Sequence, residues 1–153
     1  MPAIPGLRSP YAKVGRLVYF GRMLDKIRLH ATGRLPAEYV ANLGAGRPIF
    51  FDARCCLFLG ISYDALCARV LAGGTDEEIL AWAQAGGTRR SAEDYVVWNR
   101  FMVKLGWRDD RSAMLQVRVG EFGLAGKPIE TIFDLLDYDE GRDPARERAW
   151  ETV

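Results

Sequence analysis

The chain has 153 residues, of which 49% are hydrophobic, 27% charged and 11% aromatic. This content excludes an intrinsically disordered chain, and 16 glycines and 7 prolines are too few for a collagen-like or low-complexity protein. A net charge of +1 by itself predicts neither a nucleic acid nor a membrane as partner. A chain of this length buries about 68–70% of its unfolded surface, so we expect one domain over residues 1–153. Less ordered tails are expected at 1–10 and 143–153.

The compartment is predicted from the first residues, the apolar runs and the cysteines. Residues 1–8 lack the apolar run of a secretory signal, and no stretch approaches 18 consecutive apolar residues. The three cysteines are an odd number, and Cys55 and Cys56 are adjacent, which makes a poor disulfide framework. Reduced thiols are typical of the cytosol, so we expect a cytoplasmic protein without a membrane partner.

Glycines and capping residues mark the ends of several short helices along the chain. We expect helices at about 14–31, 36–42, 53–59, 62–72, 75–85, 91–105, 110–119 and 129–138. Asp52 is the expected cap of the third, although a strand through 49–51 is an alternative. Thr75 with Glu78 forms a capping box. Segment 110–119 alternates as a strand would, but its flanking turns favour a helix. The predicted fold is all-α, with six to eight short helices around one core.

That core is predicted from apolar residues at helical spacing. Leu24 and Ile27 in the first helix, Phe58 and Leu59 in the third, and two tryptophans further along the chain are expected to meet in it. The tryptophans are Trp82 and Trp98.

Charge is distributed unevenly between the two ends of the chain. Residues 1–34 carry seven basic groups against Asp25, and residues 130–153 carry eight carboxylates against three arginines. Such asymmetry indicates either that the ends face each other or that each faces a partner of opposite sign. We expect the acidic helix of Asp134 and Asp137 to pack beside the first helix, with Lys26 or Arg28 within salt-bridge reach of a carboxylate.

Five short sequence segments occur together in a recognisable order. They are Leu24-Asp25-Lys26-Ile27-Arg28, Phe58-Leu59-Gly60-Ile61, Thr75-Asp76-Glu77-Glu78-Ile79-Leu80-Ala81-Trp82, Ser91-Ala92-Glu93-Asp94 through Trp98-Asn99, and Phe133 to Arg142. In this order and spacing, over about residues 9–142, the chain resembles a small bacterial family catalogued as domain of unknown function 5069. The resemblance implies a family and no catalytic residues.

Metal and nucleophile chemistry is poorly supported by the residues present. His30 is the only histidine, and its place in the last turn of the first helix is typical of a cation at a helix C-terminus. A pair of His30 with Cys55 or Cys56 lacks an orienting third group within reach. Adjacent cysteines do not have zinc-knuckle spacing, so buried neutral thiols are favoured. We expect no metal and no cofactor.

Anion and cation sites were sought in the glycine turns and the acidic cluster. Gly44-x-Gly46 lacks the third glycine and the lysine of a phosphate loop. Asp134 and Asp137 lie on one helix face and could hold a hard cation or form an acid–base pair, but charge pairing with the first helix is favoured. The basic residues of that helix lack a recognition motif, so nucleic acid is not the expected partner.

Two hypotheses of function follow. The first is a non-enzymatic binding or accessory module that binds a small molecule or a protein. This module would be a monomer or a homodimer. Its candidate binding residues are Asp25, Lys26, Arg28, His30, Asp134 and Asp137. The alternative is a small enzyme that gathers Asp25, His30, Asp134 and Asp137 in a shared cleft as acid–base groups.

Overall fold

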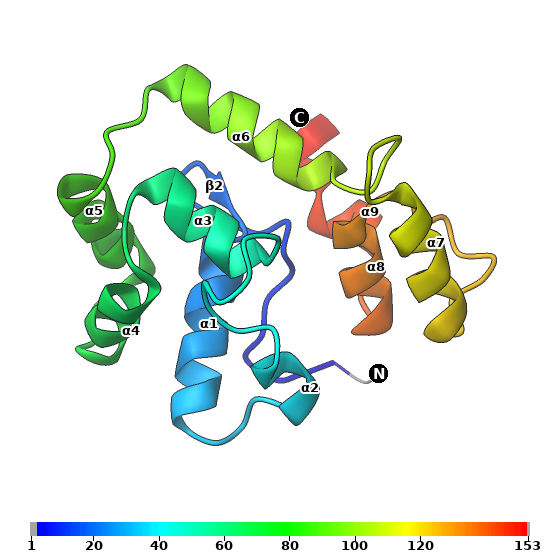
Figure 1. Ribbon diagram of the computed structural model, residues 1–153, viewed down its shortest axis with the longest axis horizontal. Coiled ribbons are helices and arrows are strands. Elements are labelled where there is room, and N and C mark those ends of the chain that lie inside the picture. Colours follow the sequence, from blue (N-terminus) through cyan, green and yellow to red (C-terminus); the bar gives the residue numbers. More distant parts are fainter. Residues whose placement is uncertain (1–2, 153) are drawn as a thin grey trace.

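Short helices account for most of the architecture (Figure 1). The structure is a computed structural model that describes residues 3–152. Within this range the strands are β1 (Lys13–Val14) and β2 (Leu17–Val18), and the helices are α1 (Phe20–Ala31), α2 (Ala37–Val40), α3 (Phe51–Leu59), α4 (Tyr63–Leu71), α5 (Asp76–Gly86), α6 (Ala92–Lys104), α7 (Ser112–Glu121), α8 (Ile132–Asp139) and α9 (Pro144–Glu147), followed by a 3-10 turn at Ala149–Thr152. The expected all-α class is confirmed. The described residues form nine helices, of which α2 and α9 have only four residues each.

The beginning of the first predicted helix is instead a small antiparallel hairpin. Lys13 pairs with Val18 and Val14 with Leu17, around a turn in which Gly15 has a φ of +55°. The Asn99 side chain of α6 accepts from the Val18 N–H and donates to the Arg16 carbonyl. The prediction of a helix from residue 14 was therefore wrong. The strand pairing and the distant Asn99 satisfy these backbone groups without a helix.

Local capping sets the starts of several helices. The Thr75 hydroxyl accepts from the Glu78 N–H at 3.2 Å, and the Glu78 carboxylate accepts from the Thr75 N–H at 2.8 Å. This confirms the predicted capping box, and Ser62 and Ser91 cap α4 and α6 in a similar way. The predicted Asp52 cap was wrong, because Asp52 lies within the first turn of α3 and its carboxylate binds groups outside that helix.

The main core lies between the hairpin, α1, α3, α4, α5 and α6, and Phe133 of α8 extends it. Leu24, Ile27, Phe58 and Leu59 are buried in it, while Trp82 and Trp98 are partly buried against the same cluster. The prediction of one core that holds these six residues is confirmed.

A second, smaller apolar cluster joins α7 to α8. Its buried members are Leu115, Val119, Ile129 and Leu135. Segment 110–119 is thus helical, as predicted, and α7 packs on α8. We refer to α7–α8 and to α1–α3 as the two units of the fold, and α6 runs above both in Figure 1. Between α7–α8 on one side and α1–α3 on the other lies an opening that side chains only partly fill.

Within residues 3–152, no helix has both the length and the apolar character needed to cross a bilayer.

Candidate functional site

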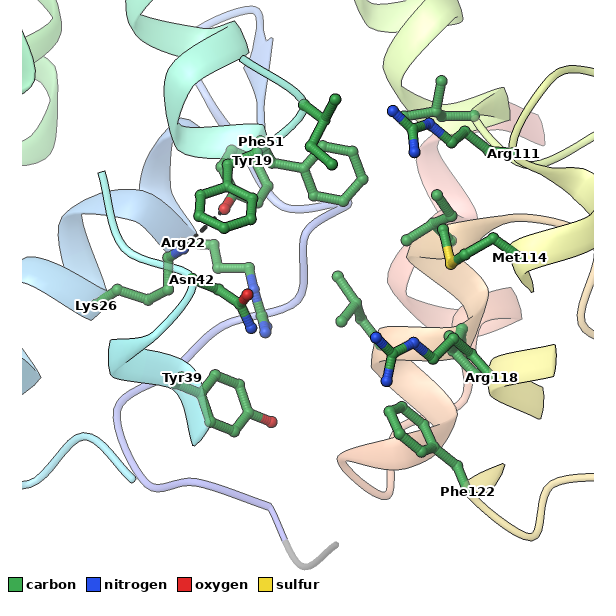
Figure 2. Close-up of a pocket in the computed structure, with 16 residues that line it drawn as sticks. Tyr19, Arg22, Lys26, Tyr39, Asn42, Phe51, Arg111, Met114, Arg118 and Phe122 are labelled. Atoms are coloured by element: carbon green, nitrogen blue, oxygen red, sulfur yellow. Dashed lines mark hydrogen bonds between the residues drawn. The ribbon is translucent and has the colours of Figure 1, made fainter. Parts of the chain in front are cut away.

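The opening between the two units is a pocket with a volume of about 310 Å³. Figure 2 shows side chains from Tyr19, α1, α2 and α3 on one wall and side chains of α7 and its preceding turn on the opposite wall. The pocket is therefore formed by segments that are far apart in the sequence, and it exists only once α7–α8 has packed beside α1.

All charged side chains that line the pocket are cations. Arg22 and Lys26 come from α1, Arg118 from α7, and Arg111 from the turn before α7. Across residues 3–152, no carboxylate contributes to the lining, whereas the polar groups of Tyr19, Tyr39 and Asn42 do. The interior consequently favours an anionic over a cationic guest.

Apolar side chains form the rest of the wall. They are Ile49, Phe50, Phe51, Leu105, Met114, Phe122, Ile132, Leu135 and Leu136. Ligand sites are commonly mostly apolar cavities with a few polar groups that orient the guest. This pocket has that composition, with guanidinium and ammonium groups as the orienting elements.

Lys26 belongs to a buried triad with Tyr19 and Asp52. Its Nζ lies 2.6 Å from Asp52 Oδ1 and donates to the Tyr19 hydroxyl at 2.9 Å, and this hydroxyl donates to Asp52 Oδ1 at 2.6 Å. Asp52 also accepts from the Gly44 N–H. Burial lowers the pKa of Lys26 and outweighs the opposing effect of Asp52. The same burial raises the pKa of Tyr19, which stays a neutral hydroxyl.

Arg22 is held by a second buried network. Its guanidinium donates two hydrogen bonds to Glu140, at 2.5 and 2.9 Å, and Tyr39 and Arg142 donate to the same carboxylate. Burial alone would raise the pKa of Glu140, but the hydrogen bonds and charges of the two arginines outweigh it and lower this pKa. Arg22 is therefore a rigid, neutralised part of the wall.

The two arginines of the opposite wall are less constrained. Arg111 lies 3.9 Å from the exposed carboxylate of Asp110, and Arg118 lies 3.2 Å from that of Glu121. Exposed pairs of this kind contribute only about 0–1 kcal/mol each. A bound anion can therefore replace either partner at small cost, which distinguishes these guanidiniums from Arg22.

Only one of the six predicted binding residues lines the pocket, namely Lys26. Asp25 accepts from Arg8 through both oxygens, and Arg28 binds Asp76 at 2.8 Å. His30 is exposed in the last turn of α1.

Asp134 and Asp137, the two predicted site residues on α8, have separate partners. Asp134 accepts from Tyr11 at 2.7 Å and from Arg148 at 2.6 Å, whereas Asp137 accepts from Ser9 at 2.8 Å. Neither lines the pocket. The structure thus does not bring Asp25, His30, Asp134 and Asp137 together in a shared cleft.

The acidic end of the chain does meet the basic first helix. The contact is made by Arg22 and Glu140, at 2.5 Å. The expected partners Lys26 and Arg28 instead bind Asp52 and Asp76. The meeting of the acidic and basic ends of the chain was correctly predicted, but the residues that form the ion pair were not.

Burial raises the pKa of all three cysteine thiols, although Cys67 is only partly buried. Cys55 and Cys56 are buried, and burial raises the pKa of Cys56 to about 12, so its thiol is neutral near pH 7. Among the residues that the structure describes, no group of three or more His, Cys, Asp or Glu is placed to hold a metal ion.

Several pocket residues were missed from the sequence, among them Arg111 and Arg118. A signal for them was present, because Arg111, Met114, Arg118 and Phe122 recur at intervals of three and four, the spacing of one helix face. A face that mixes cations with apolar side chains is typical of a binding surface. The strand-like alternation of Leu115, Val117 and Val119 obscured it.

Comparison with known proteins identifies the family. The family model described as Domain of unknown function (DUF5069) matches residues 4–142, and the chain belongs to this family. No curated protein gives a significant match.

Proposed function

We propose that this DUF5069 member is a cytoplasmic, non-enzymatic binding module whose ligand is a small organic anion with an apolar body. The observation that carries the proposal is the all-cationic charged lining of an otherwise apolar pocket. A guest without charge would leave the weakly paired guanidiniums of Arg111 and Arg118 unused, and a cation would be repelled by them.

The size and the layout of the pocket support a small molecule. A volume of about 310 Å³ lies at the lower end of the usual range for ligand sites, roughly 300–1,000 Å³. The expected pose places the anionic group beside Arg118 and the apolar body against Phe51 and Leu135. In Figure 2 Arg111 and Arg118 lie at separate positions along the α7 wall, on either side of Met114, and Arg118 reaches toward the wall of Asn42 and Tyr39, so an anion held by Arg118 would lie between the two walls.

The test is a titration with matched small probes. Para-(hydroxymethyl)benzoate supplies an anion on an apolar ring, and para-(hydroxymethyl)benzamide is its neutral counterpart. We expect the benzoate to bind in calorimetry and in amide NMR, and the amide to bind at least about tenfold more weakly, which is about 1.4 kcal/mol.

A pair of variants locates the site. Arg118→Gln removes a charge-assisted contact, so it is expected to weaken benzoate binding by about tenfold. Arg146→Gln is the control, because Arg146 is also exposed and ion-paired but lies outside the pocket. Equal binding of benzoate and amide, or equal losses in the two variants, would contradict the proposal.

A further inference from the structure

Lys26 differs from every other lysine of the chain. The sequence has four lysines, and the structure describes all of them. Lys13, Lys104 and Lys127 are exposed, whereas Lys26 is 5% exposed and lines the pocket. Lys26 therefore combines burial with a place in the lining of a cavity, an environment in which lysines act as nucleophiles.

The groups around Nζ are those needed to move protons. Asp52 lies 2.6 Å away and can accept a proton from the ammonium group. The Tyr19 hydroxyl contacts both Nζ and Asp52, so it can pass a proton between the carboxylate and a group bound at the amine. Burial of the ammonium lowers its pKa, which eases formation of the free amine.

We propose that Lys26 forms a Schiff base with an anionic aldehyde or ketone bound in the pocket, an inference that rests on the proposed anion site. The geometry selects a ligand with its functional groups at opposite ends. The carbonyl group meets Lys26 on the α1 wall, while a carboxylate or phosphate meets Arg118 on the opposite wall (Figure 2). An apolar body between them lies against the hydrophobic lining.

The chemical steps conserve atoms and charge. Asp52 takes one proton from the Lys26 ammonium, and the amine nitrogen attacks the carbonyl carbon. A second proton passes from this nitrogen to the former carbonyl oxygen, which gives a neutral carbinolamine. Asp52 returns the proton through the Tyr19 hydroxyl to the carbinolamine oxygen, the C–O bond breaks, and water leaves. The product is a protonated imine on Nζ with Asp52 again ionised. The buried pair keeps its balance of charge, so formation of the imine leaves no uncompensated carboxylate.

The experiment maps covalent trapping on the full chain. The protein is incubated near pH 7 with para-formylbenzoate and cyanoborohydride, digested, and each lysine peptide is analysed by mass spectrometry. We expect an adduct with the mass of the probe minus one oxygen atom, and we expect most of it on Lys26. Benzaldehyde, which lacks the anion, should give little Lys26 adduct. Modification confined to the exposed lysines, or spread evenly over all four, overturns the proposal.

Two variants test the assignment without removing buried charge. Lys26→Arg keeps a cation beside Asp52 but cannot form an imine, so the adduct at position 26 should be lost. Lys127→Arg removes an exposed lysine and should leave the Lys26 adduct unchanged. If Lys26→Arg does not fold, the site mapping on the natural chain remains decisive.

Failure of this inference is separable from failure of the anion site. Para-(hydroxymethyl)benzoate has the anion but no carbonyl group. If it binds and Arg118→Gln weakens it while para-formylbenzoate leaves Lys26 unmodified, the Schiff base is refuted and the anion site stands. If it does not bind and Lys26 is also unmodified, both are refuted. A Lys26 adduct that Arg118→Gln does not reduce refutes the role of the anion.

Discussion

Glu140→Gln tests whether the buried charge network holds the two units of the fold together. Glu140 is fully buried and accepts hydrogen bonds from Arg22, Arg142 and Tyr39. The glutamine has nearly the same shape but no charge, so it leaves the buried Arg22 guanidinium without its counter-ion, while Arg142 keeps Asp137 at 3.5 Å. Loss of one partner of a buried ion pair typically costs about 3–5 kcal/mol. For a domain of this size each kcal/mol lowers the melting temperature by about 2–4 °C.

The pH dependence of the unfolding free energy provides a second test of this network. The folded-state pKa of Glu140 is lowered from its ordinary value of 4.5, so the stability that its ionisation contributes is present above that value. It is lost as the pH falls below 4.5 through the folded-state pKa. We expect the difference in unfolding free energy between the natural chain and Glu140→Gln to shrink on acidification.

The assay is urea unfolding followed by circular dichroism at neutral pH and at progressively lower pH. Glu121→Gln is the control, because its ion pair with Arg118 is half exposed and should change stability by less than about 1 kcal/mol. A cost for Glu140→Gln as small as that of the control, or one that does not vary with pH, would refute the reasoning.

Three further predictions concern local features. Thr75→Ala should cost about 0.5–2 kcal/mol because it removes the capping box of α5, and an unchanged urea midpoint would contradict this. Burial raises the pKa of Asp137 to about 7 despite the hydrogen bond from Ser9. Its ionisation therefore opposes folding increasingly as the pH rises from about 4 to about 7, and Asp137→Asn should gain stability relative to the natural chain over that interval, measured by unfolding at each pH. Phe133→Ala should lower the free energy of unfolding by about 3–5 kcal/mol, because the Phe133 ring is fully buried against three other aromatic rings. Phe122 is 41% exposed, so Phe122→Ala should cost far less. Thermal and urea unfolding measure both costs.

Helix starts were predictable because their determinants are local. Ser62, Thr75 and Ser91 each accept from a backbone N–H three residues along the chain, so a short stretch of sequence contains both partners. The same argument explains the failure at residues 13–18. The spacing of Val14, Leu17 and Val18 suits a helix, but Asn99 binds this segment from α6 and stabilises a hairpin.

The sequence by itself determined the all-α class, most helix positions, the main core and the presence of opposite charge at the two ends. Only the tertiary structure decided which cation meets which carboxylate. Lys26 binds Asp52 and Arg22 binds Glu140, which is 118 residues away. A buried charge must find a counter-ion within about 4 Å, whereas the sequence shows only the number and sign of the charges. The pocket has the same origin, because its two walls come from helices that meet only after the chain has folded.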